Sequence, residues 1–153
     1  MRPMNDEDYM QMALFQARLA AQIDEVPIGA VVVKDGEVIA TAHNRREIDR
    51  DPAGHAEFLA MKAAARAVDA WRLSGCTVYV TLEPCIMCAG LMHQARIDRC
   101  VFGATDPKAG ALGTLYAINA DERLNHTFDV TSGVLQEACS TLLSDFFKRK
   151  RKK

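Results

Sequence analysis

The chain has 153 residues, of which 49% are apolar and 25% are charged, and its formal net charge is −1. These values are typical of a single soluble globular domain. No apolar run approaches the roughly eighteen residues that span a bilayer, and no hydrophobic signal segment opens the chain, so we expect a cytoplasmic protein without a membrane partner. The cysteines number five, which favours thiols and metal ligands over a disulfide framework.

The net charge hides an uneven distribution. Residues 148–153 are six consecutive cations, and without them 13 basic against 20 acidic residues leave −7 on residues 1–147. We therefore divide the chain into one domain at 1–147 and a basic C-terminal tail at 148–153. A basic tail on an acidic body favours a polyanionic partner, although a terminus that is merely solvated has the same composition.

The predicted elements follow from hydrophobic periodicity and turn signals. In chain order they are a helix at 6–22, strands at 27–33 and 38–43, a helix at 55–68, a strand at 76–82, a helix at 84–97, strands at 99–104 and 127–130, and a helix at 134–148. Residues 44–54 and 105–126 are expected as loops, the second with one helical turn near Leu115. After the first hairpin, helices alternate with strands, which implies an α/β fold with a mixed sheet and helices on both faces.

Two segments carry the chemistry, His55-Ala56-Glu57 and Pro84-Cys85-Ile86-Met87-Cys88. Together they supply one imidazole and two thiolates, which are ligands that zinc accepts. Structural zinc sites normally have four protein ligands, whereas catalytic ones keep three and leave the fourth position to water. We therefore predict a hydrolytic zinc site held by His55, Cys85 and Cys88.

The local positions of these residues support this prediction. Cys85 and Cys88 are three apart at a helix start, where they share a face and where the macrodipole favours the thiolate. Two helix N-termini above the carboxyl ends of adjacent strands would bring all three ligands together. Glu57 is the candidate proton shuttle for a metal-bound water, although residues two apart point away from each other on a regular helix.

Each half of the pattern alone is a weak signal. A Cys-x-x-Cys pair is often a structural zinc corner or a redox pair, and a His-x-Glu triplet has almost no meaning by itself. The two in this order, with proline before the first cysteine, form a specific pattern. Cys76, Cys100 and Cys139 lie in apolar segments and are expected in the core.

His-x-Glu followed by Pro-Cys-x-x-Cys is the known signature of the zinc-dependent nucleobase deaminases. Segments spread over nearly the whole chain resemble the bacterial tRNA adenosine deaminases, namely Val26–Val31, Gly54–Glu57, Tyr79–Gly90, Val101–Ala104 and Leu142–Phe147. The resemblance implies a three-layer α/β/α, cytidine-deaminase-like fold with a five-stranded mixed sheet. It also implies a homodimer with one zinc ion per subunit, and the hydrolytic conversion of adenosine to inosine at the wobble position of a tRNA anticodon.

The resemblance also assigns roles to single residues. Glu57 is expected to protonate the ring nitrogen of the flipped adenine before ammonia leaves. Asn44, just after the second strand, is expected to hydrogen-bond the target nucleotide. The other residues expected to contact the substrate are Ala56, Asp106, Lys108, Asn125, Phe147 and Lys150. One departure is Ala53-Gly54, where the family often has threonine or another polar residue.

Two other interpretations stay open. A deaminase of a free base or nucleoside, such as cytosine or guanine, would use the same zinc chemistry, but the basic tail and the tRNA-type segments weigh against it. A nucleic-acid-binding module with a purely structural zinc would lack a fourth protein ligand and would leave Glu57 without a purpose. An assay with free nucleosides and transcribed tRNA separates the first alternative from a tRNA deaminase.

Overall fold

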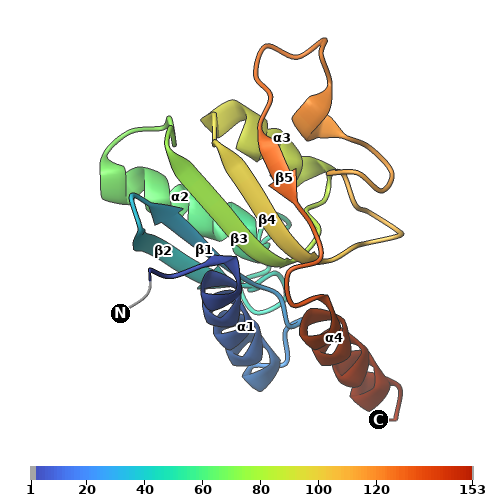
Figure 1. The fold of residues 1–153 in the computed structure, drawn as a ribbon. Coiled ribbons are helices and arrows are strands. Elements are labelled where there is room, and N and C mark those ends of the chain that lie inside the picture. The colour runs from blue at the N-terminus through green and yellow to red at the C-terminus, as the bar shows by residue number, and fades with distance from the viewer. Residues whose placement is uncertain (1–2, 153) are drawn as a thin grey trace.

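The computed structural model describes residues 3–152, in which four α-helices surround one five-stranded sheet (Figure 1). The elements are α1 (Asp6–Gln22), β1 (Gly29–Lys34), β2 (Glu37–His43), α2 (Ala56–Val68), β3 (Cys76–Leu82), α3 (Ile86–Ala95), β4 (Arg99–Ala104), the 3-10 turn η1 (Ile118–Ala120), β5 (Asp129–Thr131) and α4 (Gln136–Arg151). Among these helices, none has both the length and the apolar character that crossing a membrane requires.

The sheet is mixed, with strand order β2-β1-β3-β4-β5. β1 runs antiparallel to β2 and β3, whereas β3, β4 and β5 are parallel. The pairing places Gly29 opposite His43 and Leu82 opposite Ala104, so β2, β3 and β4 all end at one side of the sheet. We call this side the carboxyl edge, and the loops that follow these strands start there.

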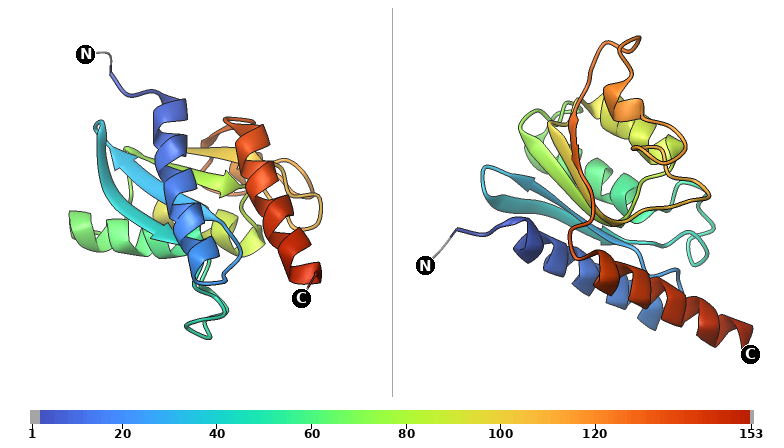
Figure 2. Two further views of the ribbon diagram at one scale, coloured as in Figure 1. Left: turned by 90° about the horizontal axis from the view of Figure 1, so that it is seen from below. Right: turned by 45° about the vertical axis from the view of Figure 1, so that its right-hand side comes forward.

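Helices cover both faces of the sheet (Figure 2). α1 and α4 lie on one face, and α2 and α3 lie on the other. The pleat of β1 sends Val31 and Val33 into the α1–α4 core and Ala30 and Val32 into the α2–α3 core, and all four are buried. Gly29 permits close packing, because a Cβ there would lie 2.0 Å from the backbone oxygen of Ala13 in α1. The predicted α/β/α arrangement is confirmed.

Local signals explain where two of the helices begin and end. α1 has the predicted bounds, since a capping box that involves Asn5 stabilises its start. α3 is shorter than the predicted range 84–97, because Pro84 precedes the N-cap residue Cys85 and therefore lies outside the helix. Arg96 then ends α3 in the left-handed conformation, with φ of 60°.

The long loop after β4 differs from the prediction in two places. Its helical turn is η1, not a turn at Leu115, whose N–H instead donates to the carbonyl of Gly110 at 2.9 Å. The last strand begins at Asp129, two residues later than predicted. The reason is that the N–H of Phe128 donates to the carbonyl of Asn119 at 3.1 Å and its side chain is buried in the core.

α4 starts and ends later than predicted. It begins after Leu135, which adopts the left-handed conformation, and continues to Arg151. Its buried side chains are Cys139 and Phe146. Lys148–Arg151 therefore extend the helix, and the proposed division of the chain at residue 147 stays a prediction.

Candidate active site

The two segments predicted to hold a metal meet at the carboxyl edge of the sheet. His55 is the N-cap residue of α2 and Cys85 is the N-cap residue of α3, while Cys88 lies buried in the first turn of α3. The Nδ1 atom of His55 lies 3.6 Å from the Sγ atom of Cys85 and 3.5 Å from that of Cys88. All three donor atoms lie within 4.8 Å of one another.

These separations fit a four-coordinate zinc ion. Zinc–nitrogen distances of about 2.0–2.1 Å and zinc–sulfur distances of about 2.3 Å, at tetrahedral angles, separate nitrogen from sulfur by about 3.6 Å. The observed separations of 3.5 and 3.6 Å match that value. In the described part of the chain no fourth His, Cys, Asp or Glu joins the group. The donor set can therefore hold a metal ion and leaves one position for a small ligand.

The two thiols differ in their acidity. A hydrogen bond from the Cys88 thiol, aided by His55, lowers the pKa of Cys85 to about 3. The same hydrogen bond and burial raise the pKa of Cys88, and the hydrogen bond to Cys85 raises the pKa of His55. One thiolate is thus favoured by the protein alone, and a divalent cation would deprotonate the second thiol.

Glu57 is the second residue of α2, and its side chain is only 4% exposed. Burial raises its pKa to about 7. Together with His55 and Cys85 it lines a cavity of about 240 Å³, which we call the site cavity. His55 and Glu57 are only two residues apart, yet both line this cavity. They can do so because His55 is not helical and has an extended backbone with φ of −84° and ψ of 143°. A carboxyl group with a pKa near neutrality can both accept and donate a proton at that pH.

The rest of the site cavity is formed by the loops after β2, β3 and β4 and by the turn before β1. Its further lining residues are Glu25, Val26, Ile28, Asn44, Arg46, Glu47, Leu82, Glu83, Asp106 and Ala109. Two of the residues predicted to contact substrate, Asn44 and Asp106, are therefore at the cavity. Ala56 is fully buried, and its N–H donates to the side-chain oxygen of Asn44 at 2.9 Å.

Three more of the predicted residues lie outside the cavity wall. Lys108 is exposed, two residues beyond Asp106 in the same loop. Phe147 and Lys150 are exposed on α4, and Lys150 forms an ion pair with Asp24. Because Asp24 directly precedes the lining residue Glu25, this ion pair brings the end of α4 close to the rim of the cavity.

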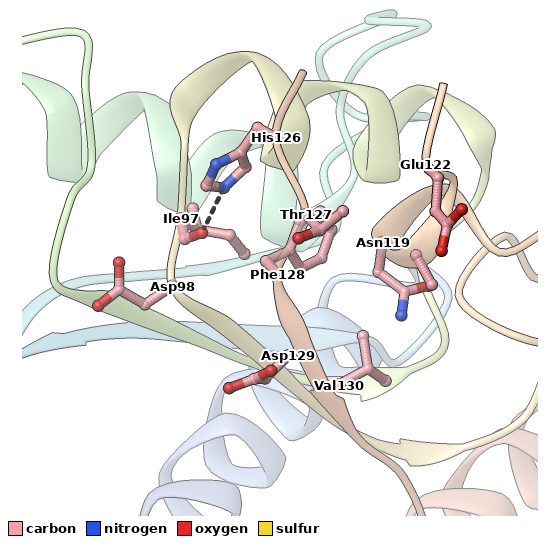
Figure 3. A pocket seen from close by; sticks show the side chains of 10 residues that line it. Ile97, Asp98, Asn119, Glu122, His126, Thr127, Phe128, Asp129 and Val130 are labelled. Carbon is pink, nitrogen blue, oxygen red and sulfur yellow. Dashed lines mark hydrogen bonds between the residues drawn. The ribbon is translucent and has the colours of Figure 1, made fainter. Parts of the chain in front are cut away.

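Asn125 lies far from these residues. It precedes His126, whose Nε2 atom is 2.8 Å from the carbonyl oxygen of Ile97, just before β4 begins (Figure 3). A shallow hollow of about 750 Å³ lies beside that end of β4, opposite the carboxyl edge. Within one chain, the structure does not bring Asn125 to the site cavity.

Sequence reasoning missed several lining residues, among them Glu25, Arg46 and Glu83. The position of Glu83 directly before Pro84-Cys85 was a usable signal. Glu25 and Arg46 carried none, because they come to the cavity only through the pairing of β1 with β2 and β3.

Comparisons with known proteins identify the family of the chain. A sequence model of the MafB19-like deaminases matches residues 4–151. The tRNA-specific adenosine deaminase of Bacillus subtilis (strain 168) is 51% identical over 148 residues, which are 97% of this chain and 92% of that protein. The protein of the same name from Haemophilus influenzae is 46% identical over 147 residues, which are 95% of this chain and 85% of that one.

Solved structures give the same result. One from studies of A-to-I editing by tRNA:A34 deaminases at the wobble position of transfer RNA has a TM-score of 0.85 and 43% identity, and covers 88% of this chain and 98% of that one. A guanine deaminase from Nitrosomonas europaea has a TM-score of 0.81 and 28% identity, and covers 95% of this chain and 86% of that one. The chain therefore belongs to the MafB19-like deaminase family and, within it, to the tRNA-specific adenosine deaminases.

Proposed function

We propose that the protein hydrolyses the exocyclic amine of adenosine at the wobble position of a tRNA anticodon and forms inosine and ammonia. One observation carries this proposal: the donor group of His55, Cys85 and Cys88 meets the buried carboxyl of Glu57 at one cavity. Similarity favours the tRNA substrate, because identity is 51% to a tRNA-specific adenosine deaminase and 28% to a guanine deaminase.

We assign one zinc ion per chain to His55, Cys85 and Cys88. Two thiolates and a neutral imidazole cancel the charge of the ion, so the partly buried group is neutral. When bound, zinc acts as a Lewis acid and lowers the pKa of a water molecule to near 7. The backbone conformation of the two N-cap residues holds the imidazole and the first thiolate in place.

Glu57 moves the protons of the reaction. It accepts a proton from the water as the water oxygen bonds to C6 of adenine, and it delivers a proton to the neighbouring ring nitrogen. A second transfer carries the remaining proton of the added hydroxyl to the amine, the C6–N bond breaks and ammonia leaves, so that one water is consumed for each inosine. Its pKa of about 7 suits both directions of transfer near neutral pH.

The size of the site cavity indicates how the substrate enters. Ligand sites for larger molecules occupy roughly 300–1,000 Å³, whereas this cavity is about 240 Å³. A cavity of this size has room for one base, so we propose that the adenine is flipped out of the anticodon stack to enter it. We propose that Asn44 and Asp106 contact the flipped nucleotide, and that Ala56 acts indirectly by orienting Asn44.

The neighbouring nucleotides lie outside the cavity. We propose that Lys108, Phe147 and Lys150 contact them, because these residues are exposed on the loop after β4 and on α4, and the ion pair of Lys150 with Asp24 places α4 near the rim. The role of Asn125 stays a prediction that the geometry of a single chain does not support.

We also propose a homodimer. Trp71 is 64% exposed and lines a shallow apolar hollow of about 330 Å³ with Leu91 and Ala95, a surface that suits a second subunit. Sedimentation velocity tests this proposal: the wild type should sediment as a dimer and Trp71→Glu as a folded monomer. A monomeric wild type would refute it.

A cytoplasmic location is the remaining proposal. Cys76, Cys100 and Cys139 are buried free thiols in the structure, and such thiols suit a reducing compartment. Fractionation of cells that produce the chain should recover its activity with the cytoplasmic tRNA pool.

Substrate assays decide among the candidate functions. The zinc-loaded protein is incubated with an anticodon stem-loop that carries adenosine at the wobble position, and separately with free adenosine, guanine and cytosine. We expect inosine only in the stem-loop, and none in a matched stem-loop with the adenosine moved to a neighbouring position. Rapid deamination of a free base without stem-loop turnover would favour the free-base deaminase. No product from any substrate would favour a binding module with structural zinc.

A further inference from the structure

Glu83 is a buried carboxylate beside the site cavity. It joins the end of β3 to Cys85, and its side chain is only 2% exposed. No lysine or arginine of the described chain forms an ion pair with it. Because a buried carboxylate is costly unless its oxygens are hydrogen-bonded, the groups that satisfy Glu83 reveal its role.

Those groups all come from one loop, residues 105–114. Oε1 accepts hydrogen bonds from the N–H of Asp106 at 3.0 Å and from the hydroxyl of Thr114 at 2.5 Å. Oε2 accepts from the N–H groups of Leu112 and Thr114, both at 3.1 Å. Each oxygen thus receives two donors, so the hydrogen-bonding capacity of this buried side chain is met without a cation.

The loop backbone is wrapped tightly around this carboxylate. A Cβ on Gly110 would lie 2.4 Å from Oε1, so only glycine fits at that position. The N–H of Gly110 donates to the carbonyl of Asp106, and the N–H of Ala111 donates to the carbonyl of Pro84, both at 2.9 Å. The loop is therefore hydrogen-bonded to a carboxyl group that lies two residues before Cys85.

The same loop supplies Asp106 and Ala109 to the wall of the site cavity. We propose that Glu83 is a positioning residue for the deamination: its carboxylate holds residues 105–114 in the conformation that presents Asp106 to the substrate, before the substrate binds. The effect on substrate rests on the proposed function, whereas the effect on the loop does not. A loop that is only partly in the competent conformation raises the apparent dissociation constant in proportion, and the chemistry itself, which Glu57 carries out, is unchanged.

Amide hydrogen exchange tests the effect on the loop without any substrate. In zinc-loaded Glu83→Gln, which keeps the side-chain shape, we expect exchange at Asp106, Leu112 and Thr114 to accelerate about tenfold or more. Exchange in β4 should not change. Glu25→Gln is the matched control, because Glu25 is also buried and accepts the N–H groups of Glu47 and Ile48 at 3.1 and 2.7 Å. Glu25→Gln should accelerate amide exchange at residues 47–48 only.

Kinetics on the anticodon stem-loop test the effect on substrate. Glu83→Gln should raise KM about tenfold while kcat stays within about threefold and the zinc content is unchanged. Asp98→Asn is the activity control, since Asp98 accepts one backbone N–H, from Gly75 at 3.0 Å, at the opposite end of the sheet. Its KM and kcat should equal those of the wild type.

Three results with Glu83→Gln would overturn the proposal. The first is unchanged amide exchange in the loop, and the second is faster exchange in the loop with an unchanged KM. The third is a loss of zinc together with an equal loss of kcat, which would indicate general damage to the protein. If Glu83→Gln does not fold, Thr114→Val removes one of the donors, and a smaller acceleration at Asp106 and Leu112 is then required. If the wild type itself does not deaminate the stem-loop, the proposed function fails, and the exchange measurement still decides the role of Glu83 in the loop.

Discussion

The side-chain oxygen of Asn44 accepts a hydrogen bond from the backbone N–H of Ala56, at 2.9 Å. This contact ties the end of β2 to the first residue of α2, next to the proposed metal ligand His55. Since the oxygen is occupied by Ala56, the amide nitrogen of Asn44 is the group left to donate to a substrate in the site cavity. Asn44 therefore has a structural role and a proposed substrate role at once.

Replacement of Asn44 separates these two roles. Asn44→Ala leaves the N–H of Ala56 without its acceptor and should lower the unfolding free energy by about 1–2 kcal/mol, in addition to reducing kcat/KM for tRNA. Asn44→Asp keeps an acceptor oxygen, so we expect near-normal stability with reduced turnover. Thermal unfolding and inosine formation are measured on both variants. Normal turnover by Asn44→Asp would leave Asn44 with a structural role alone.

Loss of the Glu57 carboxylate should remove activity and leave the metal in place. Glu57→Gln preserves the shape of this buried side chain but cannot shuttle protons. We expect kcat to fall about 10²–10⁴-fold, which corresponds to roughly 3–5 kcal/mol of transition-state stabilisation. Zinc analysis of the same sample is the control. If the zinc-loaded variant turns over normally, another group carries the proton.

The metal assignment predicts about one zinc ion per chain in the purified protein. Cys85→Ser should reduce the zinc content sharply, whereas Cys139→Ser, a buried cysteine of α4, should retain it. Because the metal binds the folded chain, its loss should also lower stability, by about 4 kcal/mol when free zinc is 1,000-fold above the dissociation constant. Metal analysis and unfolding with and without chelator measure both effects. Full zinc retention in Cys85→Ser would remove Cys85 from the ligand set.

The basic end of α4 should set the salt dependence of tRNA binding. Changing the four cations of Lys148–Arg151 to glutamine should lower the slope of log affinity against log salt by about 0.7 per lost contact, or about 1.4–2.8 for two to four contacts. Phe146 stays in place as the anchor of the helix. A variant with Lys62 and Arg66 changed to glutamine, on exposed positions of α2, shows whether the loss of cations elsewhere on the surface has the same effect. Identical slopes for all three proteins would make the tail a solvated terminus.

Low pH should weaken the ion pair between Asp6 of α1 and Arg99 of β4. Arg99 donates to both oxygens of Asp6, at 3.0 and 2.6 Å, and these hydrogen bonds lower the pKa of Asp6 below its usual value. A lowered pKa adds stability above the unfolded-state pKa, and this stability is lost as the pH falls through the lower, folded-state pKa.

Because both side chains are about one-third exposed, we expect a contribution of only about 1 kcal/mol. Asp6→Asn should be less stable than the wild type at pH 7, and the difference should shrink as the pH falls below about 4. Urea unfolding at several pH values measures it. A difference that stays constant across this range would show that the charge of Asp6 is not involved.

Much of the secondary structure and the identity of the proposed ligands followed from the sequence. α1, β3 and β4 have the predicted bounds, because capping residues and hydrophobic periodicity act over a few neighbouring positions. The ligand types were recognisable for a chemical reason, since zinc accepts few side chains and His55, Cys85 and Cys88 stand at helix starts. The family was confirmed by a family model that matches residues 4–151.

The tertiary structure decided how the cavity is built. Only strand order brings Glu25 and Asn44 beside Asp106, and only the loop after β4 reveals that its backbone closes around Glu83. The sequence also could not show the position of Asn125, which lies at the other end of β4 from the cavity. These are contacts between residues distant in the chain, and local periodicity carries no information about them, because they depend on how separate strands pair and where their loops meet.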